Sequence, residues 1–157
     1  MPDQNLNWPN TTPVSPQTFR AAAALPAGGV FDPAPLEIQV ANINFVTFYV
    51  TYTRAAQIQA GAVRLNIEAS PYAADLPVVE DWFRLSAYEV GNVALGVDNL
   101  DSIQRTTIEY GSTGAAAEMF VYGPVELRGT VERIRIAAAE SGAVANPGTC
   151  HIVGCLA

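Results

Sequence analysis

Residues 43–53 (INFVTFYVTYT) restrict the fold more than any other stretch, because nearly every side chain in it is β-branched or aromatic. Such side chains fit a pleated sheet and lower helix propensity. From Val46 to Tyr52 one set of alternating positions is apolar or aromatic, and the other set mixes aromatic residues with threonine, so neither side is clearly polar. The stretch therefore predicts a strand that is central in its sheet, or one whose outer side meets another surface.

A two-residue period continues along the chain from residue 36. The run 63–69 places apolar side chains on one side and polar ones on the other, and the run 131–138 alternates in the same way. Turn residues separate the runs, and no segment carries a helical apolar stripe over three turns. We expect an all-β fold, an antiparallel β-sandwich for which a jelly-roll is one of the fitting topologies. The expected strands are residues 36–41, 43–53, 63–69, 82–90, 93–97, 102–110, 118–122, 131–138 and 150–156.

Residues 1–35 differ in composition from the rest of the chain. They hold seven of the eleven prolines, which remove backbone donors and favour extended conformations. Phe19 begins a short stretch that fits either a helix or a strand. Trp8, Phe19 and Phe31 are buried-type side chains, which favours an extended arm that orders against another subunit over a solvated tail. We therefore divide the chain into an N-terminal arm, residues 1–35, and a sandwich domain, residues 36–157.

The charged residues restrict the partners. Fifteen acidic residues against eight basic ones give a net charge of −7, and all eight basic residues are arginine. Nucleic acid and anionic membrane surfaces both attract basic patches, so neither partner is expected. No apolar run approaches the about 20 residues of a membrane span, and the N-terminus is too polar for a secretory signal.

The arginines also bear on assembly. Arg64, Arg133 and Arg135 face away from the expected core. Arginine is enriched at protein interfaces and lysine is depleted there, so a lysine-free outer face suits contact with other subunits. Genome-wide base composition is the alternative cause of the preference for arginine.

No motif for catalysis, a cofactor or a metal stands out. His151 is the only histidine, and in a strand it points away from Cys150, which argues against a nucleophile–base pair. Cys150 and Cys155 lie too far apart along a strand for a disulfide, and with His151 they match no zinc spacing. Asp98 and Asp101 fit turn chemistry better than a calcium loop. We expect no enzyme, no cofactor and no metal site.

Aromatic residues in the strands support an alternative function. Sugars stack on exposed aromatic rings, and Trp82 with Tyr88 on one side of a strand is the candidate platform for a glycan. Aromatic side chains in strands belong more often to the core or to a subunit interface. A carbohydrate-binding β-sandwich module is therefore the second hypothesis.

Four stretches carry a resemblance: residues 45–52 (FVTFYVTY), 63–72 (VRLNIEASPY), 120–127 (FVYGPVEL) and 129–136 (GTVERIRI). In these stretches the chain resembles small β-sandwich structural proteins of tailed bacteriophages, of the head decoration or auxiliary capsid type. The resemblance implies a non-enzymatic virion protein on the capsid surface that binds the major capsid protein or other virion subunits. It also implies a homo-oligomer, with a trimer favoured, whose extended arms hold neighbouring subunits. A tail, neck or head-fibre component is the alternative place in the virion.

Overall fold

The computed structural model describes residues 16–55, 61–73, 82–85, 87–88, 104–105, 108–112, 116–127, 131–141 and 145–157. It confirms an all-β fold, because the described residues hold antiparallel strands and one three-residue 3-10 helix, Ala27–Gly29. No helix among them has the length and apolar content needed to span a bilayer. The strands are β1 (Gln17–Ala24), β2 (Glu37–Gln39), β3 (Phe45–Thr53), β4 (Gly61–Ser70), β5 (Phe83–Arg84), β6 (Ala87–Tyr88), β7 (Gln104–Arg105), β8 (Ile108–Ser112), β9 (Glu118–Glu126), β10 (Arg133–Glu140) and β11 (Thr149–Leu156).

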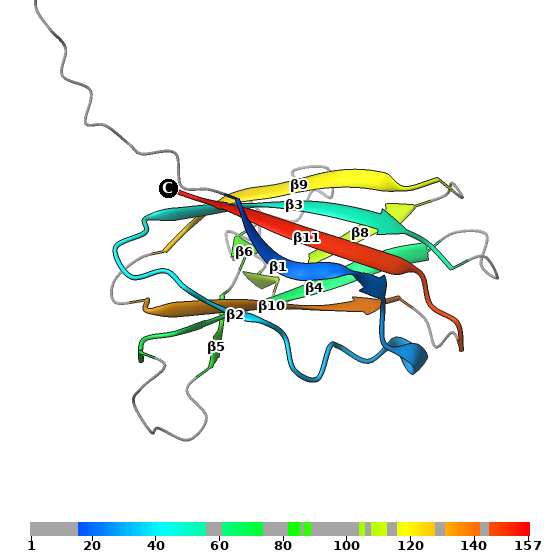
Figure 1. Ribbon diagram of the computed structural model, residues 1–157, viewed down its shortest axis with the longest axis horizontal. Helices are drawn as coiled ribbons and strands as arrows, with labels where there is room; N and C mark the ends of the chain where they lie inside the picture. Colours follow the sequence, from blue (N-terminus) through cyan, green and yellow to red (C-terminus); the bar gives the residue numbers. More distant parts are fainter. Residues whose placement is uncertain are drawn as a thin grey trace, which may run out of the picture.

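Two antiparallel sheets form the body of the molecule. The four-stranded sheet has the order β1-β11-β3-β9, and the second sheet has the order β2-β10-β4-β5, with β8 also paired to β4. β6 and β7 form a separate pair. Figure 1 shows the layers from the side, with β9, β3 and β11 above β10, β4 and β2. The arrangement is that of a sandwich-like fold in which each sheet has one inner and one outer face.

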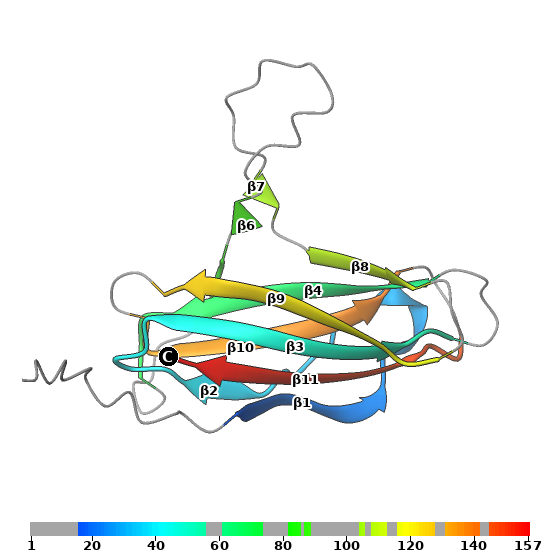
Figure 2. The same cartoon turned by 90° about the horizontal axis from the view of Figure 1, so that it is seen from above.

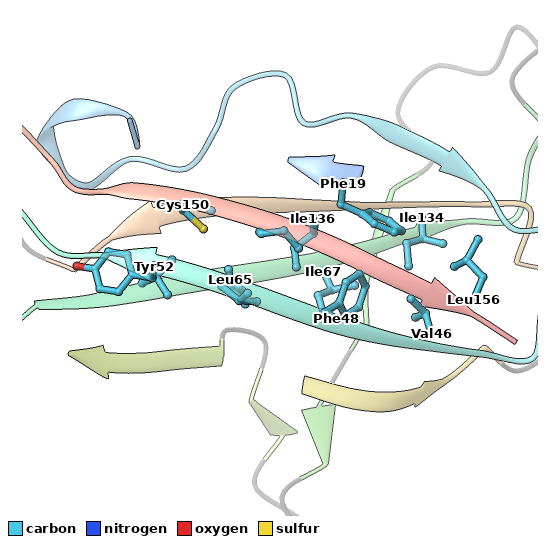
Figure 3. Close-up of a cluster of buried hydrophobic side chains, with 14 of the residues drawn as sticks. Phe19, Val46, Phe48, Tyr52, Leu65, Ile67, Ile134, Ile136, Cys150 and Leu156 are labelled. Atoms are coloured by element: carbon cyan, nitrogen blue, oxygen red, sulfur yellow. The ribbon is translucent and has the colours of Figure 1, made fainter. Parts of the chain in front are cut away.

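The core lies between the two sheets, as the alternating pattern predicts. Every second residue of β3 points inward, and Val46, Phe48, Val50 and Tyr52 are at most 1% exposed. The second sheet contributes the aliphatic side chains that alternate with its polar residues, so both inner faces interdigitate (Figure 3). The core residues opposite β3 include Val63, Leu65, Ile67, Ile134, Ile136 and Ala138.

β1 places part of the predicted arm in the four-stranded sheet. It pairs with β11, and Phe19 is 1% exposed with its ring 5.1 Å from that of Phe48, edge to face. A side chain at Gly154 of β11 would collide with the Phe19 ring, so the glycine leaves the space that the ring fills. Phe19 thus packs in the chain's own core and not against a partner, which corrects its expected role. The space that receives the Phe19 ring exists because residue 154 of β11 is a glycine, and the composition of residues 1–35 cannot predict that.

β9 continues through Gly123–Pro124 to Glu126, where the pattern predicts that the strand 118–122 ends. Gly123 has a φ of 127°, and the β3 register shifts by one residue between Val46 and Phe48 to accommodate the Gly123–Pro124 pair. Proline is tolerated here because β9 ends its sheet in the described residues, so the missing N–H removes no ladder hydrogen bond.

Two other predicted strands are divided. Residues 82–90 contain β5, paired with β4, and β6, paired with β7, and residues 102–110 contain β7 and the start of β8. Phe83 is 62% exposed because β5 is a two-residue strand at the sheet edge. The predicted strand 93–97 lies outside the described residues.

Candidate functional site: the outer face of the four-stranded sheet

Among the described residues, the largest group of exposed apolar side chains lies on the outer face of the four-stranded sheet. The register pairs Tyr49 of β3 with Val121 of β9, and Thr51 with Met119. Directly opposite residues of an antiparallel pair share a face, so these side chains lie on the side away from the core. Phe45, Tyr49, Met119 and Val121 are 42%, 47%, 83% and 59% exposed, and we call these four residues the outer patch. Figure 2 looks onto this face.

The outer patch continues across the sheet. β11 adds Val153 opposite Tyr49, and His151 opposite Thr51. Glu126, paired with Phe45, is the acidic residue on this face of β3, β9 and β11, and none of these three strands contains an arginine. The middle of this face, around the pairs Tyr49–Val121 and Thr51–Met119, therefore presents apolar and uncharged polar side chains, in a protein whose net charge is −7.

The outer face of the second sheet is different, because its arginines are paired. Arg133 donates to a carboxylate oxygen of Glu37 at 2.6 Å, and Arg135 donates to one of Glu68 at 2.6 Å. Trp82 lies against both arginines, with the guanidinium carbons 5.0 and 4.2 Å from its ring centroid. Acid, arginine and indole thus satisfy one another within the chain.

The segment between β1 and β2 covers the opposite end of that face. Arg64 of β4 donates to the carbonyl of Gly29 at 2.6 Å and lies over the Phe31 ring, with 5.4 Å to the centroid. Asp32 accepts from Arg20 at 3.0 Å and from the backbone N–H of Ala138 at 3.0 Å. The arginines face outward as predicted, but these contacts lie within the chain, so the structure gives no support to their expected use between subunits.

The free edge of β9 is also partly closed. Tyr110 of β8 donates its hydroxyl to the carbonyl of Val121 at 3.1 Å, and its ring stacks on Phe120 at 4.7 Å between centroids. An edge carbonyl that already accepts a hydrogen bond is a poorer template for an added strand. The face of the sheet, and not this edge, is the more accessible surface for a partner.

The predicted site residues do not come together. Trp8 lies outside the described residues, Phe19 is in the core, and Phe31 lies under Arg64. Trp82 is engaged with the two arginines, and the side chain of Tyr88 lies outside the description, although its backbone belongs to β6. The glycan platform is therefore represented in the structure by Trp82 alone, and the arginines occupy part of its ring surface.

The cysteines and the histidine lie as the strand pattern predicts. Cys150 is 1% exposed and points into the core, whereas His151 and Cys155 lie on the outer face of β11. Burial raises the pKa of the Cys150 thiol to about 12, so this group stays protonated at neutral pH. Both cysteines are free thiols. Asp98 and Asp101, the acidic pair of the sequence analysis, lie outside the described residues.

Glu140 is a buried carboxylate that the sequence pattern does not predict. It is 0% exposed and accepts hydrogen bonds from the Tyr52 hydroxyl at 2.9 Å, from the Ala55 N–H at 3.1 Å and from the Gly148 N–H. Burial, together with the bond to Glu140, raises the pKa of Tyr52. Because the carboxylate is enclosed, its role is to join the ends of β3, β10 and β11. The alternating pattern gave only a weak signal, an acid at the inward-pointing end of an apolar strand.

Comparison with models of known protein families, with curated proteins and with solved structures found no match. The two outer sheet faces differ in which side chains they leave exposed. One face is filled by the chain's own charged and aromatic residues, and the other leaves apolar residues in contact with solvent. The outer patch is the stronger candidate site.

Proposed function

We propose that the chain is a non-enzymatic structural protein of a tailed-bacteriophage virion, most closely of the head decoration type, which acts by binding other subunits through the outer patch. The observation that carries the proposal is the exposure of Phe45, Tyr49, Met119 and Val121 together on one sheet face. Clustered apolar groups of this kind mark protein interaction surfaces, whereas single exposed apolar residues do not.

The resemblance to phage structural proteins supplies the setting for this contact. The proposed partners are the major capsid protein or other virion subunits, including further copies of the chain, and the proposed location is the capsid surface. A protein that binds only the assembled shell stabilises that shell by mass action. A tail, neck or head-fibre location is the alternative within the same proposal. The jelly-roll connections stay a prediction, and so does the part of the predicted arm, residues 1–15, that lies outside the described residues.

The carbohydrate hypothesis receives no comparable support. The Trp82 ring contacts Arg133 and Arg135, which are held in place by Glu37 and Glu68. A sugar that stacks on this ring must share or displace these contacts. The contacts with the two arginines of β10 thus give Trp82 a role in holding β5 at the edge of the second sheet.

Association with particles is the test of the proposed function. Virions purified from the source phage should contain the native chain by mass spectrometry. Virions that lack the chain should take up the recombinant wild-type protein and Val30→Glu, and they should take up at least about tenfold less Tyr49→Glu. Val30 is 58% exposed and lies away from the outer patch, so its variant controls for the added charge. Absence of the chain from particles, or equal uptake of the three proteins, contradicts the proposal.

A further inference from the structure

We propose that the outer patch is self-complementary and that its occupant is a second copy of this chain, packed sheet against sheet about a two-fold axis. This inference rests on the proposed function for its setting and names the partner of the same patch. Three features support it, namely the distribution of charge, the size of the face and the closure of the other outer surface.

Charge favours an identical partner. Two copies carry −7 each, so most of their surfaces repel one another. The central rows of the patch, built on Tyr49 with Val121 and on Thr51 with Met119, contain no acid and no arginine, so they can meet their own image without like charges in opposition. A strongly basic or acidic partner would find no complementary charge there.

The size of the face fits a weak dimer. β3 and β9 are nine residues long, and four strands lie side by side. With a rise of about 3.4 Å per residue and a strand spacing of about 4.8 Å, the face covers roughly 600 Å². Two such faces bury roughly 1,200 Å², the lower end of specific interfaces. We therefore expect a dimer with a dissociation constant of about 1 µM or weaker.

The geometry of the strands assigns the contacts. A two-fold axis in the interface that crosses β3 at right angles near residue 48 reverses the strand direction of the second copy. Phe45 of one copy then lies at the level of Thr51 and Met119 of the other, and Tyr49 lies near the axis. Methionine on an aromatic ring is a favourable contact, and two aligned sheets pack about 10 Å apart.

The second sheet leaves this face as the available one. In the described residues, the ion pairs of Arg133 and Arg135 and the contact of Arg64 with the segment around Phe31 cover the central strands β10 and β4 on the outer side of the second sheet. One open face on each copy produces a closed pair and not an extended array. A dimer differs from the trimer that the resemblance implies, and solution mass separates the two.

Sedimentation equilibrium of the full chain from about 1 to 500 µM tests the inference. The wild type should shift from the monomer mass of 16.7 kDa to twice that value as concentration rises. Tyr49→Glu places a charge near the axis and should weaken association at least tenfold. Val30→Glu adds the same charge elsewhere and should associate like the wild type. Circular dichroism checks each fold, and Tyr49→Ser replaces Tyr49→Glu if the latter unfolds.

The outcomes separate this inference from the proposed function. A wild type that is monomeric at every concentration, a trimer, or a dimer insensitive to both Tyr49 variants overturns the second-copy proposal. If such a protein still binds virions through Tyr49, the proposed function stands and its partner is another virion subunit. A Tyr49-dependent dimer that no virion contains supports the pairing and contradicts the virion role.

Discussion

The outer faces of the two sheets have opposite characters. On the second sheet, Arg133 and Arg135 bind acids of neighbouring strands and enclose Trp82. On the four-stranded sheet, Tyr49 and Met119 remain 47% and 83% exposed with no charged side chain between them. In the described residues, the chain's own side chains cover the first face, whereas the outer patch stays exposed. Exposed apolar residues on one sheet therefore indicate a contact surface more strongly when the same chain covers the outer face of its other sheet with its own side chains.

The two sides of β3 offer the sharpest test of this comparison within one strand. Phe48 is 0% exposed and its neighbour Tyr49 lies on the outer patch. Phe48→Ala should lower the free energy of unfolding by about 3–5 kcal/mol, because it leaves a cavity in the core. Tyr49→Ala should change the stability of the monomer by less than about 1 kcal/mol. Urea denaturation at low protein concentration measures both, and similar losses would contradict the assigned faces.

The thiols of β11 test the same comparison by pH. The raised pKa of Cys150, about 12 in the folded chain, lies above that of an unfolded thiol, about 8.5. The folded state therefore retains its proton more tightly, and stability falls as pH rises from about 9 towards 12, by up to about 1.4 kcal/mol per unit from this group. The raised pKa of Tyr52 acts in the same direction.

Matched cysteine variants isolate that contribution. Cys150→Ala should reduce the alkaline loss of stability without removing the part due to Tyr52. Cys155→Ala, on the outer face, is the control for substitution of a cysteine outside the core. Thermal denaturation between pH 8 and 11 measures the slopes, and equal slopes for the two variants would contradict the core position of Cys150.

Asp32 tests whether the covered face depends on the chain's own contacts. Its carboxylate joins Arg20 to the N–H of Ala138, and both side chains of the ion pair are mostly buried. Asp32→Ala should lower the unfolding free energy by about 2 kcal/mol, because it removes the counterion of Arg20 and leaves the Arg20 Nε–H and the Ala138 N–H without their acceptor, while the other guanidinium nitrogens keep backbone carbonyls. Glu37→Gln, at the more exposed pair with Arg133, should change it by less than about 1 kcal/mol. Equal effects would show that the Asp32 junction is not special.

The sequence predicts the inner faces better than the outer ones. Alternation within β3, β4, β10 and β11 identifies their core residues, since burial of one side sets a period of two. The two-sided character of residues 43–53 predicts a central strand or one whose outer side meets another surface, and β3 is indeed central, between β11 and β9. Met119 and Val121 become part of the outer patch only through the β3–β9 register, which joins segments about 70 residues apart.

Other features depend on contacts that a single sequence does not reveal. The place of Phe19 follows from the gap at Gly154, and the role of Trp82 follows from arginines more than 50 positions later. Glu140 is satisfied by three donors from two separate segments, the end of β3 and the start of β11, so its burial is a tertiary property. The extent of the arm and the pair Trp82–Tyr88 stay predictions for the residues outside the description.

A paired measurement on Trp82→Ala and Tyr49→Ala tests the contrast between the two faces most directly. Denaturation of dilute protein and sedimentation of concentrated protein are measured for each variant. Trp82→Ala should lower the unfolding free energy by about 1 kcal/mol, through lost contacts with its arginines, and should associate like the wild type. Tyr49→Ala should keep the monomer's stability and weaken association. Association that survives Tyr49→Ala but is lost in Trp82→Ala would contradict the assignment of the contact surface to the outer patch.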